Sequence, residues 1–412
     1  MYLLFTSNSN WNQPYRFACR MLVFLMGIGV CLAPWEFMMW RSGECLPTEW
    51  VVEQQIHDPE LVTGRAVFTY QGSLYKYLSL QKRAPSIWVI GSSRAMQFRS
   101  MMFNPFEKDF YNAGGIFHNL LDLEFFARKF KEGELTPPRM ILLTIDPWWL
   151  KQSAHKESSR LAKLHSENGR LYPALRDQFF AFRDYLEKPV VSLRVFNLFD
   201  SLRMRQYPYN ASGLRPILTG DGFRYDGSRL YAKNIQSFIK QPKYQEVRGF
   251  NQEAAEEKGR FKPTEGLSSQ YLERLLKSIR VFASQRIEIH TLFPPVSNEI
   301  QTILKKADSR NSESRHWWFE CTDTAAKKIR EEGIPCKVVS SPADFGLDDR
   351  VMIDGIHPSE VFVAHILKDL INQSPEDSIL HQINATNIDA LLQRQETIPV
   401  SFMFEGVETF SL

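Results

Sequence analysis

The sequence predicts an α/β protein: a three-layer α/β/α sandwich on a mainly parallel sheet, with an insertion and an N-terminal transmembrane helix. Two observations support this fold class. Short apolar segments that end at glycine or polar residues alternate with segments whose apolar residues recur at helical spacing. The 412-residue chain is also 43% hydrophobic and 24% charged, which is typical of globular proteins and sufficient for a sizeable core.

Five short strands are predicted by their apolar content and by the turns that end them. The third is a continuous apolar run of the kind that is buried on both faces of a parallel sheet. A helical pattern through Met101 follows the first strand. Strands that alternate with helices indicate a doubly wound sheet with right-handed crossovers. The strands are expected at 86–90, 109–112, 140–145, 287–292 and 336–339, and further helices at 117–130, 272–283 and 322–332.

The N-terminal region contains the longest apolar run. Residues 21–40 carry a single charge, Glu36, over the length of a bilayer span. Arg16 and Arg20 precede this run, so residues 1–20 should stay cytoplasmic and the body should face outward. A cleaved signal peptide is one alternative, and a buried core helix in a cytosolic protein is another.

The remaining boundaries follow from where the alternation starts, stops and is interrupted. Residues 41–84 show no sustained period and are interpreted as a stalk, and residues 374–412 as a C-terminal extension. The α/β domain then occupies 85–373, with an insertion at about 147–265 that contains helical stretches at about 174–204. Since ligands bind beyond the carboxyl ends of parallel strands, an insertion leaving the third strand is expected to form a lid or a glycan platform there.

Charge and cysteine content exclude several classes of function. A net charge of +3 gives no field of the size that nucleic-acid binding requires. The five cysteines form no Cys-x-x-Cys pair, so neither a metal site nor a cofactor is expected. Cys321 and Cys336 flank a predicted helix. They either form a disulfide or remain as two buried thiols.

Polar residues that could carry chemistry stand at the predicted strand ends and near the C-terminus. Ser93 follows the first strand, and Asp354 and His357 lie three residues apart. A serine hydroxyl becomes nucleophilic when a histidine takes its proton, and a carboxylate is the usual group that orients the histidine. Each residue has a simpler interpretation: Ser93 as a helix N-cap, Asp354 as a turn residue and His357 as a helix-start residue.

Taken together, these blocks resemble the SGNH/GDSL hydrolase superfamily. Gly91-Ser92-Ser93 stands at the first block, Gly114 at the second, Asp146 at the third, and Asp354 and His357 at the last. The resemblance implies a Ser93 nucleophile, a His357 base oriented by Asp354, and oxyanion-stabilising backbone N–H groups of Ser93 and Gly114. It also implies the flavodoxin-like form of the α/β/α sandwich.

Two residues depart from the superfamily pattern. Ser92 replaces an aspartate that is outside the triad, and Asp146 replaces the asparagine that donates to the oxyanion. An ionised carboxylate can only accept hydrogen bonds and would repel developing negative charge. Either Asp146 turns away and another donor serves, or the enzyme is slow, or the site is silent.

With these departures, the sequence resembles one branch of the superfamily. A Gly-Ser-Ser block, a strand ending in Asp146-Pro147-Trp148-Trp149 and a single N-terminal anchor are similar to membrane-anchored proteins of cell-envelope acylation, such as the D-alanyl transfer protein and the alginate acetylation proteins. The resemblance implies a membrane-bound O-acyltransferase as partner and an extracytoplasmic glycan as substrate. Trp148 and Trp149 either stack on a sugar or pack in the core, and His118 either lines the site or is a surface residue.

The sequence therefore predicts an extracytoplasmic serine acyltransferase or esterase, membrane-anchored by a single pass, that forms an acyl-enzyme at Ser93. Water as acceptor gives an esterase and a sugar hydroxyl gives a transferase, and the triad is the same for both. The alternative is a catalytically silent glycan-binding or scaffold partner of a membrane acyltransferase, which the aspartate at position 146 favours.

Overall fold

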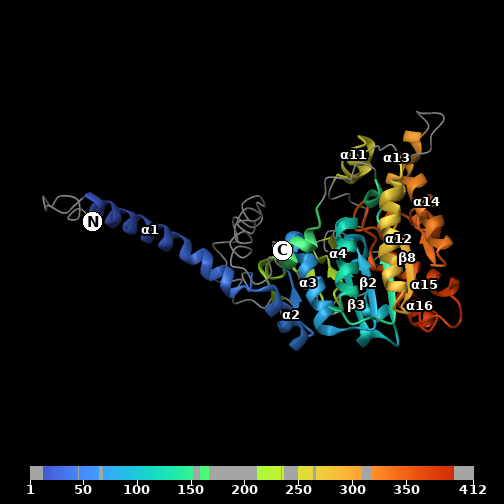
Figure 1. Cartoon of the computed structure of the whole chain (residues 1–412), viewed down its shortest axis with the longest axis horizontal. Coiled ribbons are helices and arrows are strands. Elements are labelled where there is room, and N and C mark those ends of the chain that lie inside the picture. The colour runs from blue at the N-terminus through green and yellow to red at the C-terminus, as the bar shows by residue number, and fades with distance from the viewer. Residues whose placement is uncertain are drawn as a thin grey trace.

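A parallel five-stranded sheet forms the centre of the structure, which is a computed structural model (Figure 1). Each neighbouring pair in this sheet is parallel. Of the five strands in this sheet, the one that comes first in the chain, residues 87–91, pairs with both the second and the third. The direction of winding therefore reverses beside it, as in doubly wound sheets of the flavodoxin-like order. In spatial order the strands are β3 (Phe110–Gly114), β2 (Ile87–Gly91), β4 (Met140–Thr144), β8 (Glu288–Phe293) and β9 (Cys336–Val338).

The structure describes most of the chain, but only part of the insertion. The helical stretches predicted at about 174–204 lie outside the described residues. The described residues are 13–44, 46–64, 68–151, 158–166, 211–232, 234–235, 249–262, 266–308 and 317–393.

Two layers of helices cover the sheet, and successive residues of β2 face opposite layers. Trp88 and Ile90 join one hydrophobic cluster, whereas Ile87 and Val89 join the other, as the period of two in a strand requires. The predicted α/β class and mainly parallel sheet are thereby confirmed. The first layer contains α3 (Phe68–Arg83), α4 (Leu120–Lys131), α12 (Ser269–Ala283), α13 (Asn298–Asp308) and α14 (Trp317–Glu331), and the second α15 (Glu360–Gln373) and α16 (Ala385–Gln393).

Residues 41–84 are not a stalk. Helix α2 (Thr48–His57) and helix α3 bury Val52, Tyr75 and Tyr77 in the same core as the sheet. The residues that face the core are divided between two short helices and are separated by polar residues. The sequence therefore shows no sustained apolar periodicity in this segment. The α/β unit therefore begins well before residue 85.

The insertion pairs with this lead-in segment to form a second, small sheet. Strand β1 (Val62–Thr63) lies between β5 (Ala211–Ser212) and β6 (Gly222–Phe223), and β6 pairs with β7 (Arg229–Leu230). Segments some 150 residues apart in the chain are thus joined by backbone hydrogen bonds. In the described parts of the insertion, the short helices are α5 (Arg160–Ser166), α9 (Leu214–Thr219) and α11 (Phe250–Ala255).

The described part of the C-terminal extension belongs to the second helix layer. Leu380, Ile383, Ile388 and Leu391 are buried in the cluster that α15 forms with the sheet. On the opposite side of the sheet, Cys321 and Cys336 are buried free thiols. Of the two alternatives for these cysteines, the structure therefore shows the unbonded one.

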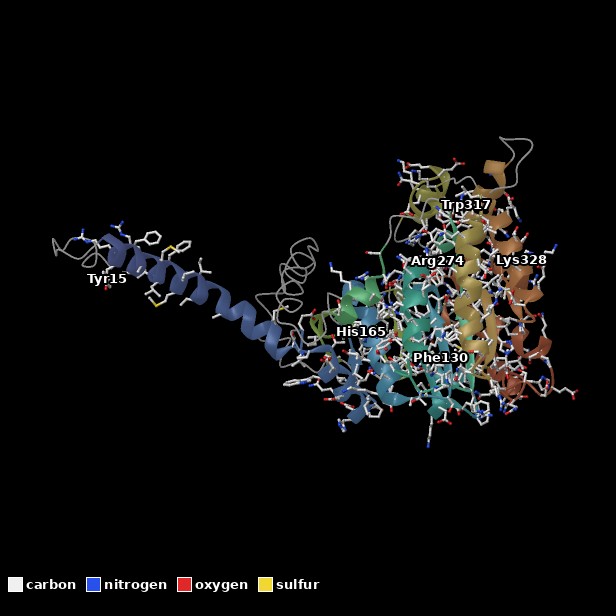
Figure 2. All side chains as sticks on the ribbon, viewed as in Figure 1. Tyr15, Phe130, His165, Arg274, Trp317 and Lys328 are labelled. Carbon is white, nitrogen blue, oxygen red and sulfur yellow. The ribbon has the colours of Figure 1, made fainter. Side chains whose placement is uncertain are left out.

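Helix α1 (Gln13–Arg41) contains the segment predicted as a membrane span. It has 29 residues and extends away from the α/β body, with Tyr15 near its far end (Figure 2). Within the ranges that the structure describes, no helix has both the length and the apolar character needed to cross a bilayer. A helix is present here, but the transmembrane span predicted at 21–40 is not confirmed.

Removing the lead-in segment should abolish folding. We expect a chain that starts at residue 46 to unfold cooperatively in urea, and one that starts at residue 85 not to fold. Each large buried side chain lost costs about 2 to 5 kcal/mol, against a total stability of about 5 to 15 kcal/mol, and the shorter chain lacks several of them. Far-UV circular dichroism during urea titration measures both chains, and equal transition midpoints would contradict the expectation.

Candidate active site

Ser93 lies at the carboxyl end of β2, on a tight turn. The residues 93–95 form a 3₁₀ turn that is capped by Ser92, whose Oγ accepts a hydrogen bond from the Arg94 N–H at 3.2 Å. Gly91 has a φ of +151°, and a Cβ there would lie 1.9 Å from Thr144 Oγ1, so only glycine fits against β4. The turn leaves Ser93 half-buried between two buried neighbours.

The helix predicted after the Gly91-Ser92-Ser93 turn, through Met101, is wrong. The segment forms two separate 3₁₀ turns, because the side chain of Asn112 binds carbonyl groups that an α-helix would use. Its Nδ2 donates to the carbonyls of Ala95 and Phe98, at 2.8 and 2.7 Å. The competing side-chain bonds hold the turn open and keep the Ser93 hydroxyl at the end of the sheet.

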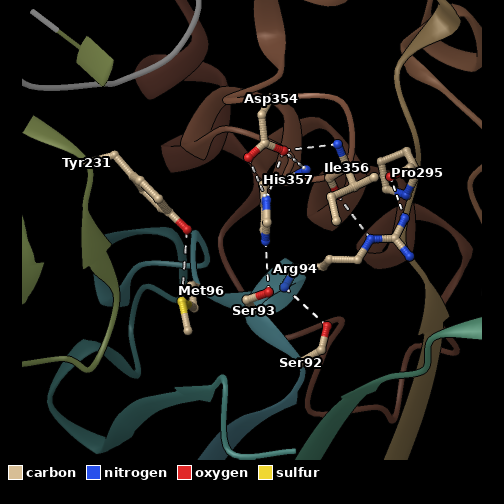
Figure 3. Close-up of polar contacts among 9 residues, drawn as sticks. All are labelled: Ser92, Ser93, Arg94, Met96, Tyr231, Pro295, Asp354, Ile356 and His357. Atoms are coloured by element: carbon tan, nitrogen blue, oxygen red, sulfur yellow. Dashed lines mark hydrogen bonds and ion pairs between the residues drawn. The ribbon is translucent and has the colours of Figure 1, made fainter. Parts of the chain in front are cut away.

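The structure brings Ser93, His357 and Asp354 together in one chain of contacts (Figure 3). Ser93 Oγ lies 2.8 Å from His357 Nε2, and His357 Nδ1 lies 2.8 and 2.9 Å from the two carboxylate oxygens of Asp354. With Asp354 as its acceptor, Nδ1 carries the proton, and Nε2 is left to accept the proton of the serine. This is the arrangement that a serine nucleophile requires.

Asp354 is held in its ionised form by the loop that it closes. One of its oxygens accepts the backbone N–H groups of Ile356 and His357, at 3.0 and 2.9 Å. Burial alone would raise the pKa of Asp354, but the His357 ring and these N–H groups outweigh it and lower the pKa to about 2. The sequence predicted this pair from its spacing, and the close turn explains why a spacing of three suffices.

Gly114 lies beside the nucleophile turn, but its N–H is not the oxyanion donor that the sequence suggested. A Cβ at this position would lie 2.8 Å from both Ala95 C and Met96 N, so glycine permits the close approach of β3. Its N–H, however, donates to Asn112 Oδ1 at 2.7 Å. In the described part of the chain, the Ser93 N–H has no such acceptor, which leaves it as the candidate donor.

Asp146 forms a buried ion pair with Arg94. Arg94 Nη1 donates to Asp146 Oδ1 at 3.0 Å, and the two side chains are 0% and 1% exposed. Burial raises the pKa of Asp146, and the guanidinium of Arg94 opposes that rise. Asp146 is thus a counter-ion, and it does not supply the amide of the superfamily asparagine.

The two tryptophans after β4 have different environments. Trp149 is 1% exposed and packs edge-on against Phe117, so of its two alternatives, sugar stacking and core packing, the structure shows core packing. Trp148 is half-buried, and the guanidinium groups of Arg94 and Arg260 lie 5.5 and 5.2 Å from the centroid of its ring. Only Trp148 is placed to meet a ligand.

His118 and His290 lie outside the constellation. His118 is exposed at the start of α4 and has its Nε2 3.3 Å from Arg160 Nη1. Its predicted place at the mouth of the site has no support from the contacts of the described residues. His290 is buried in β8, where its Nε2 lies 2.6 Å from Glu288 Oε1.

The insertion contributes residues at the site that sequence reasoning missed. The ring of Phe250 lies 6.2 Å from that of His357, and the guanidinium of Arg260 lies 4.7 Å from the Phe250 ring. The β6–β7 hairpin also holds the nucleophile turn, because the Arg229 N–H donates to the Met96 carbonyl at 2.9 Å. No spacing in the sequence points to these contacts, which depend on how the insertion folds back.

No family model matches the chain, and no curated protein matches it. Among the described residues no group of three or more His, Cys, Asp or Glu side chains is placed to hold a metal ion. The site consists of a serine, Ser93, a histidine base, His357, and the carboxylate of Asp354, which orients the histidine.

Replacing Asp354 by asparagine should change how stability depends on pH. A depressed pKa stabilises the fold above the unfolded-state value, near 3.9, and that contribution disappears as the pH falls toward about 2. We expect the wild type to lose about 2 kcal/mol more unfolding free energy than Asp354→Asn between those two values. Urea unfolding at several pH values measures it.

The matched control for this experiment is Asp377→Asn, at an exposed position. It should follow the wild-type pH dependence. Parallel curves for the wild type and Asp354→Asn would contradict the assignment of Asp354 as an ionised, buried group.

Proposed function

We propose that this chain is a serine acyltransferase or esterase of the SGNH type, acting on O-acyl groups of a cell-envelope glycan. The observation that carries the proposal is the 2.8 Å contact between Ser93 Oγ and His357 Nε2. The two residues are 264 positions apart in the chain, and the contact supports the proposal because a serine nucleophile needs a base within hydrogen-bonding reach.

In the first half-reaction Ser93 becomes acylated. His357 Nε2 takes the hydroxyl proton as Ser93 Oγ attacks the ester carbonyl, which forms the C–O bond of a tetrahedral intermediate. The bond to the leaving alcohol then breaks, and His357 returns the proton to that alcohol. Asp354, hydrogen-bonded to Nδ1, stabilises the imidazolium that forms between the two steps.

The second half-reaction releases the acyl group to an acceptor. Water or a sugar hydroxyl gives its proton to His357 Nε2 and attacks the acyl-enzyme carbonyl, and His357 then protonates Ser93 Oγ as the bond to the acyl group breaks. Water gives an esterase and a sugar hydroxyl gives a transferase. The half-buried position of Ser93 admits either acceptor.

The oxyanion stabilisation in this proposal is weaker than in the superfamily pattern. The Gly114 N–H is bonded to Asn112, and Asp146 has no proton to donate when it is ionised. Ser93 N–H is the remaining candidate among the three predicted oxyanion residues. Since the loss of one donor costs about a hundredfold or more in rate, we expect slow turnover of small esters.

A glycan substrate is supported by the aromatic and basic side chains around the triad. Trp148 presents a half-buried ring, and Arg260 bridges it to Phe250, next to His357. Aromatic faces and charged planar groups are common partners of sugars and their substituents. These three residues form the sugar-binding rim of the proposed site.

The proposal includes an extracytoplasmic location beside a membrane-bound O-acyltransferase. Its support is helix α1, on which large apolar side chains such as Phe17, Phe24 and Met26 are exposed. A continuous apolar surface of this kind marks contact with a protein or a membrane. The resemblance to envelope-acylation proteins supplies the identity of the partner.

The second candidate is a catalytically silent scaffold that binds the glycan and recruits the acyltransferase. The engaged Gly114 N–H and the aspartate at position 146 favour it, since both reduce oxyanion stabilisation. The contacts among Ser93, His357 and Asp354 favour the enzyme. Activity toward an activated ester separates the two.

Replacing Ser93 by alanine should abolish ester hydrolysis. With p-nitrophenyl acetate we expect kcat/KM to fall about a thousandfold or more, because the variant has no nucleophile. A fluorophosphonate probe should label the wild type at Ser93, as located by mass spectrometry, and should leave the variant unlabelled. Ser284→Ala, at an exposed helix end, is the matched control. Equal rates for the wild type and Ser93→Ala would favour the scaffold.

Replacing Trp148 by alanine should weaken glycan binding more than ester chemistry. We expect KM for an O-acetylated xylo-oligosaccharide to rise about fivefold, which corresponds to about 1 kcal/mol of lost stacking, with a smaller change for p-nitrophenyl acetate. Trp50→Ala is the matched control, because Trp50 is 58% exposed on α2. Equal changes with both substrates would argue against a sugar contact at Trp148.

A further inference from the structure

The side chain of Arg94 lies beneath the proposed active site and joins separate segments of the chain. Its Nε donates to the Ile356 carbonyl at 3.0 Å, and its Nη1 donates to Asp146 at 3.0 Å. Its Nη2 donates to the carbonyls of Pro294 and Pro295, after β8. The side chain thus connects the ends of β2, β4 and β8 to the loop that carries His357. Figure 3 shows its contacts with Pro295 and Ile356.

One of these contacts joins the immediate neighbours of the two reacting residues. Arg94 follows Ser93 in the chain, and Ile356 precedes His357. Two contacts therefore link the same two chain segments. One joins Arg94 Nε to the Ile356 carbonyl, and the other joins Ser93 Oγ to His357 Nε2.

The environment makes Arg94 rigid. Its side chain is 0% exposed, and its planar group carries five N–H donors in a fixed arrangement. Four protein oxygens accept from it. A lysine has a point charge on a flexible stem and cannot reproduce this geometry, although it would keep the positive charge beside Asp146.

We propose that Arg94 is a positioning residue, which sets the distance between the Ser93 hydroxyl and the His357 imidazole through the Ile356 carbonyl. Asp146 is the counter-ion that orients its guanidinium. The inference rests on the proposed acyl-transfer function and adds a residue to it. Arg94 touches neither substrate nor the reacting atoms, so its effect on rate passes through His357.

The test is a double-mutant cycle of wild type, Arg94→Lys, His357→Ala and the double variant, each assayed with p-nitrophenyl acetate. Arg94→Lys should lower kcat about a hundredfold, the scale expected for a misplacement near 1 Å, and leave KM within about twofold. In the His357→Ala background the same substitution should change the residual rate less than about twofold, because there is no imidazole left to position.

Each other outcome of the cycle overturns the positioning role. An equal fall in both backgrounds would mean that Arg94 acts on the fold in general, and no fall in the wild-type background would mean that it has no part in the reaction. Failure of the proposed function is distinguishable, because Ser93→Ala and His357→Ala would then both keep the wild-type rate.

A second variant covers the case in which Arg94→Lys does not fold. Arg94→Met combined with Asp146→Asn removes both charges, and buried ion pairs replaced as a unit are often tolerated. Thermal unfolding checks the fold, and the same cycle with His357→Ala should again show a fall only where the imidazole is present. If neither variant folds, Arg94 serves the stability of the core, and the proposal is overturned.

Discussion

The burial of one charged side chain organises this structure at the end of its sheet. The guanidinium of Arg94 is removed from water, so its N–H groups must find acceptors in the protein, because an unpaired buried charge costs several kcal/mol. Those acceptors come from Asp146, from the chain after β8 and from Ile356. The hydrogen bonds of the Arg94 guanidinium therefore bring together the segments that carry Ser93 and His357.

The strand order of the sheet determines where these segments meet. Because β2 pairs with both β3 and β4, the crossovers leave β2 in opposite directions, and the space beyond its carboxyl end is open to both sides. Ser93 follows that strand directly. The insertion then closes part of this space with Phe250, whose ring is 6.2 Å from the ring of His357, so the surroundings of the triad come from a segment far from it in the chain.

The strands and the triad were readable from the sequence because each rests on a local pattern. Apolar runs predicted every strand of the large sheet to within two residues, and the spacing of Asp354 and His357 reflects one turn. Helix α3 and the role of Arg94 were not readable. The first depends on burial against a sheet formed later in the chain, and the second on carbonyl groups supplied by distant loops. The bond from the Gly114 N–H to Asn112 was missed for the same reason, because a side chain took a donor that the family pattern leaves open.

The long separation between Ser93 and His357 has a consequence for biosynthesis. A ribosome makes the chain from its N-terminus, so the hydroxyl emerges long before the imidazole that would activate it. Contacts between distant segments form late and slowly, and strands β2, β3 and β4 can pair while the histidine is still untranslated. The segment with Ser93 can therefore fold before its base exists, and the contact between the two groups forms only after the segment with His357 has been synthesised.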